Sequence, residues 1–457
     1  MIPMTLAEIA EVLDARLDNV PDPQVVVTGP AAVDSREVAA GGLFVATVGE
    51  RVDGHDYADK AVAGGAVAVL ASRPVAAPAI LVDDVQAAIG VLARHVLTHL
   101  DCTVLALTGS VGKTTTKDLL AQILEPFAPT ISTDRSFNNE LGLPLTVLQA
   151  GPGTRYLVLE MGAGRKGDLT YLTDIAPPHV SLVLNVGAAH VSRMGGGLAD
   201  VAEAKGELVE ALAPDGYALL NAADPYVMGM ADRTKGKIVL YGRTPDASVR
   251  AENIRLDDRV RPSFDLVMPT GRARVELELI GEHQVANALG AAAAAGTLGL
   301  STEEIAAGLN AARRRSSGRF EITERPDGVT VINDAYNANP ESMRAGLHAF
   351  HALAGARRTI AVLGAMGQQG DASEAQHEKM GRLVAELGID ILIAVGEGDP
   401  RAMARGASGA AVAVHPVQDA AEAALVANEL IASGDVVFVK SSSDSSLFGC
   451  ARELANS

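Results

Sequence analysis

One segment decides the fold class of this chain: Thr108-Gly109-Ser110-Val111-Gly112-Lys113-Thr114-Thr115. An apolar run, 102–108, leads into it and a helical pattern follows, which is the strand–loop–helix context of a phosphate-binding loop. The glycines let backbone amides turn toward a phosphate, and the helix N-terminus adds a favourable dipole. Lys113 can reach the β- and γ-phosphates of a nucleotide, while the Thr114 hydroxyl can bind Mg²⁺. The segment therefore predicts an ATP site rather than a glycine turn with a surface lysine.

Apolar runs and helical patterns alternate on both sides of this segment. They predict an α/β protein of three domains, 1–100, 101–313 and 314–457, with a basic polar linker at 313–318. Expected strands are 42–48, 66–71, 79–82, 102–108, 156–160, 180–186 and 217–221, with a hairpin of 263–268 and 273–280. Expected helices are 57–63, 85–100, 198–212, 282–298, 341–353, 374–387 and 420–431. Four continuous apolar runs predict a parallel sheet buried on both faces in the third domain: 329–333, 359–363, 391–395 and 436–439.

Composition restricts the partners of the protein. Its 38 Lys and Arg against 56 Asp and Glu give a net charge of −18, which disfavours binding to nucleic acid. Two cysteines among 457 residues indicate a reduced, cytoplasmic protein. Residues 1–14 lack the basic start of a signal peptide, and the longest uncharged stretch, 284–302, is rich in Ala and Gly and predicts a buried helix. We therefore expect no membrane partner, and further expect small-molecule substrates and a monomer.

The phosphate loop has an unusual spacing. The general pattern G-x-x-x-x-G-K-[ST] would place glycine at position 107, where this chain has leucine. The shorter form T-G-x-x-G-K-T resembles the ATP loop of the Mur ligases, which join amino acids or peptides to UDP-muramoyl precursors of peptidoglycan. Further motifs of that family follow in the family's order: Asp34-Ser35-Arg36, Gly42-Leu43-Phe44-Val45-Ala46, Asp53-Gly54-His55, Ser136-Phe137-Asn138-Asn139-Glu140-Leu141-Gly142-Leu143-Pro144 and Asn333-Asp334-Ala335-Tyr336-Asn337-Ala338-Asn339-Pro340.

The last two motifs are most similar to the MurF branch of the family, which adds D-Ala-D-Ala. The resemblance implies an ATP-dependent ligase that joins D-Ala-D-Ala to UDP-N-acetylmuramoyl-tripeptide through an acyl phosphate, with Mg²⁺. It also implies a role for each domain. The domain at 1–100 would bind the UDP-substrate, the P-loop domain at 101–313 would bind ATP, and the Rossmann-like domain at 314–457 would bind the amine acceptor.

Candidate catalytic residues surround the loop. Glu160 ends the apolar strand 156–160, where an acidic side chain can face the phosphates as a metal ligand. The resemblance implies that His190 helps to hold a second metal and that Lys205 is carbamylated, which would turn a cation into a carboxylate-like metal ligand. Without the family, Lys205 would be a helix-surface lysine paired with Glu203 or Glu207. The expected catalytic set is Lys113, Glu160, His190 and Lys205, and the expected metal ligands are Thr114, Glu160, His190 and Lys205.

Further residues are assigned to binding. His283 and Asn287, four positions apart, would share one helix face, and the resemblance places them near the nucleotide. It also implies that Arg319 and Asp334 hold phosphate and ribose from the third domain. The remaining expected nucleotide-binding residues are Gly109, Ser110, Gly112, Thr115, Tyr336 and Asn337. The expected substrate-binding residues are Ser35, Arg36, Asp53, His55, Asn138, Asn139, Asn339 and Lys440.

Three segments depart from the MurF pattern. Residues 364–370 lack the carboxylates that the branch carries there, Arg193 stands where a glutamate normally follows the histidine, and 440–444 lacks an arginine. An acceptor with an ammonium and a carboxylate is best recognised by an anion and a cation. The exchanges therefore indicate either a rearranged acceptor pocket or another acceptor, with neutral drift as the alternative.

Two other functions stay open at this point. One is a MurF-like amide ligase of specialised metabolism that uses a different acid or amine. The other is a regulatory ATPase that couples nucleotide hydrolysis to association with a partner. The combination of Glu160, His190, Lys205 and Asp334 argues against the second, because a switch needs no site for activating a carboxylate.

Overall fold

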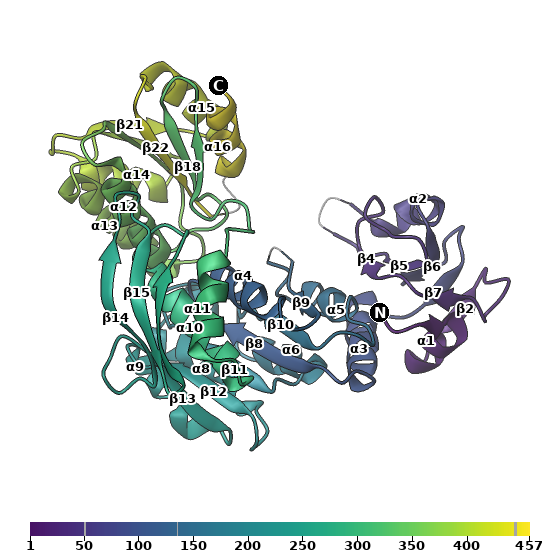
Figure 1. Ribbon diagram of the computed structural model, residues 1–457. Helices are drawn as coiled ribbons and strands as arrows, with labels where there is room; N and C mark the ends of the chain where they lie inside the picture. Colours follow the sequence, from purple (N-terminus) through teal and green to yellow (C-terminus); the bar gives the residue numbers. More distant parts are fainter. Residues whose placement is uncertain (50–51, 135, 443–445) are drawn as a thin grey trace.

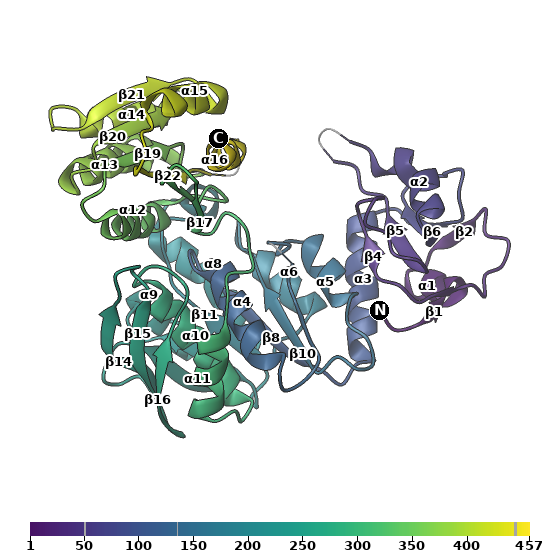
Figure 2. The same ribbon diagram turned by 45° about the horizontal axis from the view of Figure 1, so that its top comes forward.

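The computed structural model describes residues 1–49, 52–134, 136–442 and 446–457 of the chain. Three sheet-based units follow one another along the sequence, from the purple N-terminal unit through the teal centre to the yellow-green C-terminal unit (Figures 1 and 2). The predicted α/β architecture, with a central P-loop sheet and a C-terminal parallel sheet, is confirmed. The domain boundaries at 100/101 and 313/314 remain a proposal.

The first unit is built on a five-stranded sheet of order β2-β7-β6-β5-β4, beside a short antiparallel pair of β1 and β3. Its elements are β1 (Met4–Thr5), α1 (Leu6–Val12), β2 (Arg16–Asp18), β3 (Val26–Val27), β4 (Ala31–Ala32), β5 (Gly42–Val45), η1 (Gly54–Tyr57), α2 (Ala58–Ala63), β6 (Ala66–Ala71), β7 (Ala79–Leu81) and α3 (Val85–Thr98). The apolar β5 is fully buried, and β6 nearly so. Helix α3 contacts α1 and also α5 and α6 of the next unit, so it joins the two units.

The second unit is a nine-stranded sheet of order β16-β15-β14-β13-β12-β11-β8-β10-β9. Its elements are β8 (Thr103–Thr108), α4 (Lys113–Leu124), β9 (Thr130–Ser132), α5 (Gly142–Val147), β10 (Tyr156–Glu160), α6 (Asp168–Ile175), β11 (Val180–Val183), α7 (Val191–Met194), α8 (Leu198–Glu210), β12 (Tyr217–Asn221), α9 (Pro225–Met228), η2 (Ala231–Arg233), β13 (Lys237–Gly242), β14 (Val249–Leu256), β15 (Pro262–Met268), β16 (Gly271–Glu276), α10 (Gln284–Thr297) and α11 (Thr302–Ala311).

The strand order of this sheet positions the site. Neighbouring strands from β9 to β14 run parallel, so β10, β8 and β11 end side by side at one edge. Ligands of open parallel sheets bind beyond the carboxyl ends of the strands. Glu160 ends β10, while Lys113 and His190 follow β8 and β11, so the three residues converge at this edge.

Two further predictions hold in this unit. The expected hairpin is the antiparallel pair β15–β16, although β16 ends at Glu276 rather than at residue 280. The uncharged stretch 284–302 begins with α10, whose small side chains are almost all buried against α4 and against β11 to β15. Alanine and glycine permit this close approach of helix to helix and sheet. None of the helices in the described ranges is long and apolar enough to cross a membrane.

The third unit is a six-stranded sheet of order β17-β18-β22-β19-β20-β21. Its elements are β17 (Glu321–Glu324), β18 (Thr330–Asn333), α12 (Pro340–Ala354), β19 (Thr359–Leu363), η3 (Gly370–Ala372), α13 (Ser373–Glu386), β20 (Ile391–Val395), α14 (Asp399–Ala407), β21 (Ala413–Val417), α15 (Ala420–Leu430), β22 (Val436–Lys440) and α16 (Leu447–Asn456). The four predicted strands β18, β19, β20 and β22 are buried along their whole length and pair in parallel, as expected.

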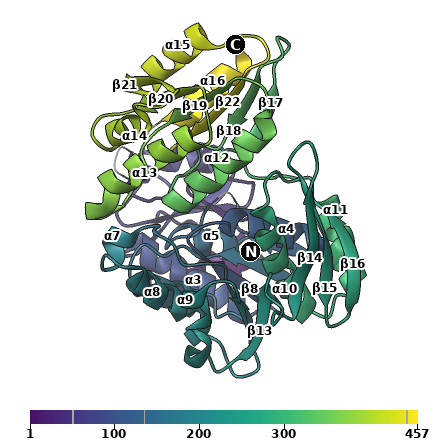
Figure 3. The same cartoon turned by 90° about the vertical axis from the view of Figure 1, so that its left-hand side faces the viewer.

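This unit lies over the central unit, with α12 on the side that faces it (Figure 3). The linker at 313–318 has neither helix nor strand and is held against α4 and the turn that follows it. Arg315 pairs with Glu125 at 2.5 Å, and the Ser316 hydroxyl donates to Asp118 at 2.7 Å. The start of the third unit is thereby fixed close to the phosphate loop.

Candidate active site

The phosphate loop joins β8 to α4 and needs glycine at a defined place. Gly112 caps α4 with φ of +84°, a conformation that side chains other than glycine rarely adopt. A Cβ at this position would lie 2.2 Å from Asn287 Oδ1, so the space is closed as well. Asn287, on α10, thus lies directly against the loop, and His283 caps the start of the same helix. Desolvation lowers the pKa of His283.

The loop is braced by Asn185, which follows β11. Its Oδ1 accepts hydrogen bonds from the backbone N–H groups of Ser110 and Val111 at 3.0 and 2.9 Å. Lys113 folds back so that its ammonium donates to the Gly109 carbonyl at 2.8 Å. Burial lowers the pKa of Lys113, the charge of Glu160 opposes the change, and the charge of Arg319 adds to it. The loop is therefore preformed, with the first N–H groups of α4 available to an anion.

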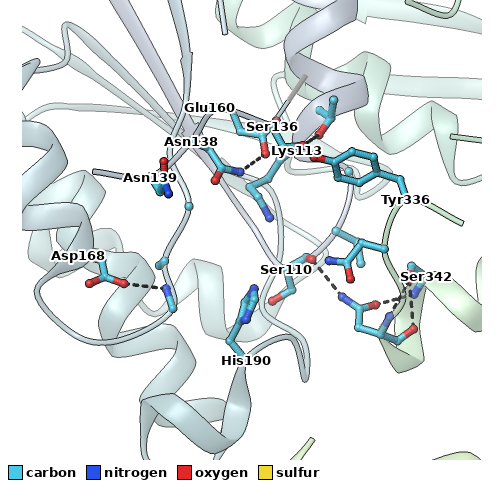
Figure 4. Close-up of a pocket in the computed structure, with 18 of the residues that line it drawn as sticks. Ser110, Lys113, Ser136, Asn138, Asn139, Glu160, Asp168, His190, Tyr336 and Ser342 are labelled. Carbon is cyan, nitrogen blue, oxygen red and sulfur yellow. Dashed lines mark hydrogen bonds between the residues drawn. The ribbon is translucent and has the colours of Figure 1, made fainter. Parts of the chain in front are cut away.

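A cavity of about 740 Å³ opens in front of the loop, with Lys113, Asn138 and Glu160 close together at its upper wall in the view of Figure 4. The central and third units both supply lining residues. The predicted site residues that line it are Ser110, Gly112, Lys113, Thr114, Thr115, Asn138, Asn139, Glu160, His190, Arg319, Tyr336, Asn337 and Asn339. A second cavity of about 670 Å³ shares four of its lining residues, Thr114, Ser136, Arg319 and Tyr336.

Glu160 is placed as a cation ligand. It ends β10 and is 1% exposed. One carboxylate oxygen accepts from Asn138 Nδ2 at 2.6 Å, and the other is buried without a hydrogen-bond partner in the described part of the chain. An unpaired buried carboxylate oxygen is costly unless a cation binds it. The hydroxyl of Thr114 and this oxygen are the hard ligands that Mg²⁺ prefers.

His190 lies across the cavity from Glu160, on the loop after β11 (Figure 4). Its backbone is left-handed, with φ of +59°, and its Nδ1 hydrogen-bonds to Gln368 of the third unit. Desolvation lowers the pKa of His190, and the nearby charges of Lys113 and Lys205 add to the effect, while the hydrogen bond to Gln368 opposes it. The ring is therefore held neutral, the form that binds metals.

The reading of Lys205 as a surface lysine is wrong. This side chain is 1% exposed on α8, while Glu203 pairs with Lys166 and Glu207 accepts from the Thr170 amide. Burial lowers the pKa of Lys205 to about 7, with a further contribution from Lys113. Lys205 does not line the cavity, but its charge acts on Lys113 and His190, so the buried amine lies near both of them.

Residues of the third unit reach the phosphate loop. Arg319 lies over the Tyr336 ring at 4.5 Å and its Nη2 donates to Thr114 Oγ1 at 3.3 Å. Asn339, which caps α12, donates from Nδ2 to the Ser110 carbonyl at 3.2 Å. The arginine Nε is buried and, among the described residues, has no acceptor. Both contacts bring cationic and polar groups to the place where a triphosphate would bind.

Asp334 and Lys440 are brought together, although they were assigned to nucleotide and substrate. The Lys440 ammonium is 2.6 Å from one carboxylate oxygen of Asp334 and 3.0 Å from the Asn337 carbonyl, and the side chain is 2% exposed. The other carboxylate oxygen of Asp334 accepts from the Phe320 amide. Neither residue, both within the described ranges, lines the cavity. The pair supports the loop that carries Tyr336 and Asn337.

The predicted residues of the first unit lie in a turn (Ser35 and Arg36) and at the start of η1 (Asp53 and His55), outside the cavity lining. Arg36 is exposed and pairs with Asp34, one position before Ser35. His55 Nδ1 lies 2.6 Å from Asp53, whose pKa is lowered to about 2 by the His55 backbone and side-chain hydrogen bonds. Their assignment to the UDP-substrate remains a prediction.

Two of the three departures meet in space. The loop at 364–370 contacts the segment at 188–193. The Ser192 hydroxyl donates a hydrogen bond to the backbone carbonyl of Gln368 at 3.0 Å. Arg193 lines the cavity. The third departure includes Ser443 and Asp444, which lie outside the described residues. Among the lining residues that sequence reasoning did not assign to the site are Ser136, Glu140, Arg165, Asp168 and Ser342, although Ser136 and Glu140 stand in a quoted motif.

The residues present fit a metal, although the described residues contain no group of three His, Cys, Asp or Glu side chains that could hold one. Glu160 and His190 supply two such ligands, and the unpaired Glu160 oxygen needs a cation. The expected third ligand, a carbamate on Lys205, would be anionic, but Lys205 is buried and does not line the cavity.

Comparison with known proteins agrees with this geometry. Three family models match: the Mur ligase family catalytic domain at 32–96, the Mur ligase middle domain at 107–295 and the Mur ligase glutamate ligase domain at 318–443. A UDP-N-acetylmuramoyl-tripeptide--D-alanyl-D-alanine ligase from Mycobacterium bovis is 42% identical, with 99% of this chain and 98% of the relative covered.

Solved structures lead to the same result. A crystal structure of MurF from Acinetobacter baumannii is 32% identical with a TM-score of 0.86, covering 100% of this chain and 99% of that chain. MurF ligase from Thermotoga maritima, in complex with ADP, is 28% identical with a TM-score of 0.78, covering 94% and 97%. The resemblance seen in the motifs is thus confirmed. The chain belongs to the Mur ligase family and is an ATP-dependent ligase.

Proposed function

We propose that this ligase joins D-Ala-D-Ala to UDP-N-acetylmuramoyl-tripeptide in the synthesis of peptidoglycan precursors. The observation that carries the proposal is the cavity that unites the phosphate loop, the unpaired Glu160 oxygen and residues of the third unit. Relatives similar over nearly the whole chain carry this activity in their names, which favours it over a ligase of specialised metabolism. The cytoplasmic location, which the low cysteine content indicates, and the monomeric state remain predictions.

The first step makes an acyl phosphate. An oxygen of the donor carboxylate attacks the γ-phosphorus of ATP. The bond between this phosphorus and the β,γ-bridging oxygen breaks, and ADP leaves with that oxygen. Two anions must approach each other, so cationic groups are required. Lys113 and the start of α4 would hold the phosphates, and Arg319 would reach them from the third unit. Mg²⁺ held by Thr114 and Glu160, with a second ion at His190, would neutralise charge that develops on the phosphates.

The second step makes the amide bond. The neutral amine of the acceptor attacks the acyl carbon, inorganic phosphate leaves, and the nitrogen loses a proton to the medium. The contacts of Asn339 and Arg319 with the phosphate loop hold the third unit against the cavity. Closure of the two units around the substrates would exclude water and protect the acyl phosphate from hydrolysis.

Carbamylation of Lys205 is part of the proposal. Only a neutral amine attacks CO₂, and a lysine with its usual pKa of 10.5 is almost entirely protonated at pH 7. Burial lowers the pKa of Lys205 to about 7, so about half of the side chains are reactive at that pH. The carbamate formed would be an anion among the charges of Lys113 and a bound cation, which favours it.

One assay tests the function. The purified protein receives Mg²⁺, ATP and the muramoyl-tripeptide, with and without D-Ala-D-Ala, while phosphate release and product mass are measured. Phosphate release that depends on the dipeptide, with the mass of the pentapeptide, is the expected result. Lys113→Ala should abolish turnover, whereas Lys237→Ala, a surface lysine on β13, should not. Turnover only with another acid or amine would transfer the proposal to specialised metabolism, and phosphate release without any amide product would refute a ligase.

A further inference from the structure

The third unit forms hydrogen bonds with the loop that carries His190. Gln368 Oε1 hydrogen-bonds to His190 Nδ1, and the Ser192 hydroxyl donates to the backbone carbonyl of Gln368 at 3.0 Å. Beside them, Gln369 Nε2 donates to the Ala188 carbonyl at 3.2 Å. Contacts on both sides of His190 therefore come from one loop, between β19 and α13.

The two residues that meet are both held in an unfavourable backbone conformation. His190 has φ of +59° and Gln368 has φ of +60°, in the left-handed region where a side chain costs about 1–2 kcal/mol. Gly370 also has positive φ, and a Cβ there would lie 2.9 Å from the Ser192 Cβ, so the two loops are closely fitted. Backbone strain of this kind persists where surrounding contacts enforce it, and it concentrates at functional sites.

The hydrogen bond decides which nitrogen of His190 carries the proton. In the structure the amide oxygen of Gln368 faces Nδ1 and can only accept, so in this orientation of the amide Nδ1 carries the proton and the neutral ring leaves Nε2 with its lone pair. Among the described residues Nε2 has no hydrogen-bond partner, and the ring lines the cavity. Histidines that bind metals commonly donate the other N–H to an oxygen acceptor, which fixes both tautomer and orientation.

We propose that Gln368 is a positioning residue that holds His190 in the Nδ1–H tautomer, with Nε2 available to a metal in the cavity. The third unit thereby controls whether the histidine is ready to bind, and docking of that unit completes the site. This inference rests on the metal-binding role given to His190 under the proposed function.

The first test is the tautomer itself. ¹⁵N NMR of imidazole-labelled full-length protein reports the protonation of each ring nitrogen, and loss of one signal in His190→Gln assigns it among the 10 histidines. We expect the Nδ1–H form in the wild type, a mixture of tautomers in Gln368→Ala, and restoration in Gln368→Glu, whose carboxylate also accepts. Ser192→Ala is the matched control, because it removes a contact of the same loop without touching the ring.

The second test is metal affinity, measured by EPR of Mn²⁺ with ADP present. Loss of a hydrogen-bond partner of a metal-binding histidine typically weakens affinity 10- to 100-fold. We expect a loss of at least about 10-fold in Gln368→Ala and less than about threefold in Gln368→Glu and Ser192→Ala. An unchanged tautomer in Gln368→Ala, or equal losses in Gln368→Ala and Ser192→Ala, would overturn the proposal. Neither readout depends on turnover, so a failure of the ligase assay would refute the proposed function separately.

Discussion

Replacing Lys205 by methionine should make the folded protein more stable while abolishing its activity. The lysine is 1% exposed, and in the described structure no carboxylate pairs with it. Methionine has a similar length and no charge, so it can fill the space of the aliphatic stem. The variant removes the cost of burying an unpaired amine, and with it the group proposed to form a carbamate.

The magnitude follows from the pKa. Lys205 has a pKa of about 7 in the folded protein against 10.5 in a model peptide. At about 1.4 kcal/mol per pKa unit, burying this amine costs at most about 5 kcal/mol of folding free energy relative to leaving it in water. Between pH 7 and pH 10.5 the unfolded chain binds more protons at this lysine than the folded protein does. The free energy of unfolding of the wild type therefore rises with pH in this range. The cost is fully present below pH 7 and is lost as the pH approaches 10.5.

Thermal melting in CO₂-depleted buffer measures this effect. We expect Lys205→Met to melt above the wild type at pH 7, with a difference that shrinks as the pH rises toward 9.5. Bicarbonate should raise the melting temperature of the wild type alone, because a reaction confined to the folded state stabilises it. Lys117→Met is the matched control: Lys117 is also buried but is paired with Asp118 at 2.5 Å, so its loss should destabilise the protein. A difference that does not change with pH, or an equal response of both proteins to bicarbonate, would refute the reasoning.

Three further changes test other parts of the structure. Glu160→Gln should lower turnover at least about a hundredfold with unchanged melting, because it removes the anionic ligand and keeps an acceptor for Asn138; near-normal turnover would exclude Glu160 as a metal ligand. Gly112→Ala should abolish nucleotide binding measured by calorimetry, since φ is +84° and the new Cβ would lie 2.2 Å from Asn287 Oδ1; ADP binding at wild-type affinity would contradict this. Phe438→Ala, beneath the stacked Phe350 ring, should lower the free energy of unfolding by about 3–5 kcal/mol in urea titration, and a loss below about 1 kcal/mol would show that the core repacks.

The buried parallel strands of the third unit could be predicted from the sequence, whereas the partly exposed strand β14 could not. The strands at 359–363 and 391–395 are continuous apolar runs because both faces of the sheet are covered. Strand β14, in contrast, carries Arg250 and Glu252 on a partly exposed face, and β16, on the far side of β15, contributes Arg272, which pairs with Glu252 at 2.5 Å. Ion pairs between residues twenty positions apart stabilise this part of the sheet. Such charged residues do not give the alternation of apolar side chains from which a strand is predicted.

The site shows the same limit. Glu160 could be assigned because it ends a strand next to the phosphate loop, and parallel strands end together. The burial of Lys205 could not be predicted from the sequence, because a lysine on a helix becomes buried only through the elements that pack over it. The ion pair of Asp334 with Lys440 joins positions 106 residues apart, and the contact of His190 with Gln368 exists only when two units dock. Tertiary packing, rather than local pattern, determines these contacts.

The most direct test of the account follows one oxygen atom. The muramoyl-tripeptide is labelled with ¹⁸O in the carboxylate that will form the amide bond, and it is turned over with ATP and D-Ala-D-Ala. The released phosphate is examined by ³¹P NMR. If the loop that carries Lys113 holds ATP so that this carboxylate is phosphorylated, one ¹⁸O atom per turnover must appear in inorganic phosphate. Amide product accompanied only by unlabelled phosphate would contradict the acyl phosphate and the role assigned to the cavity.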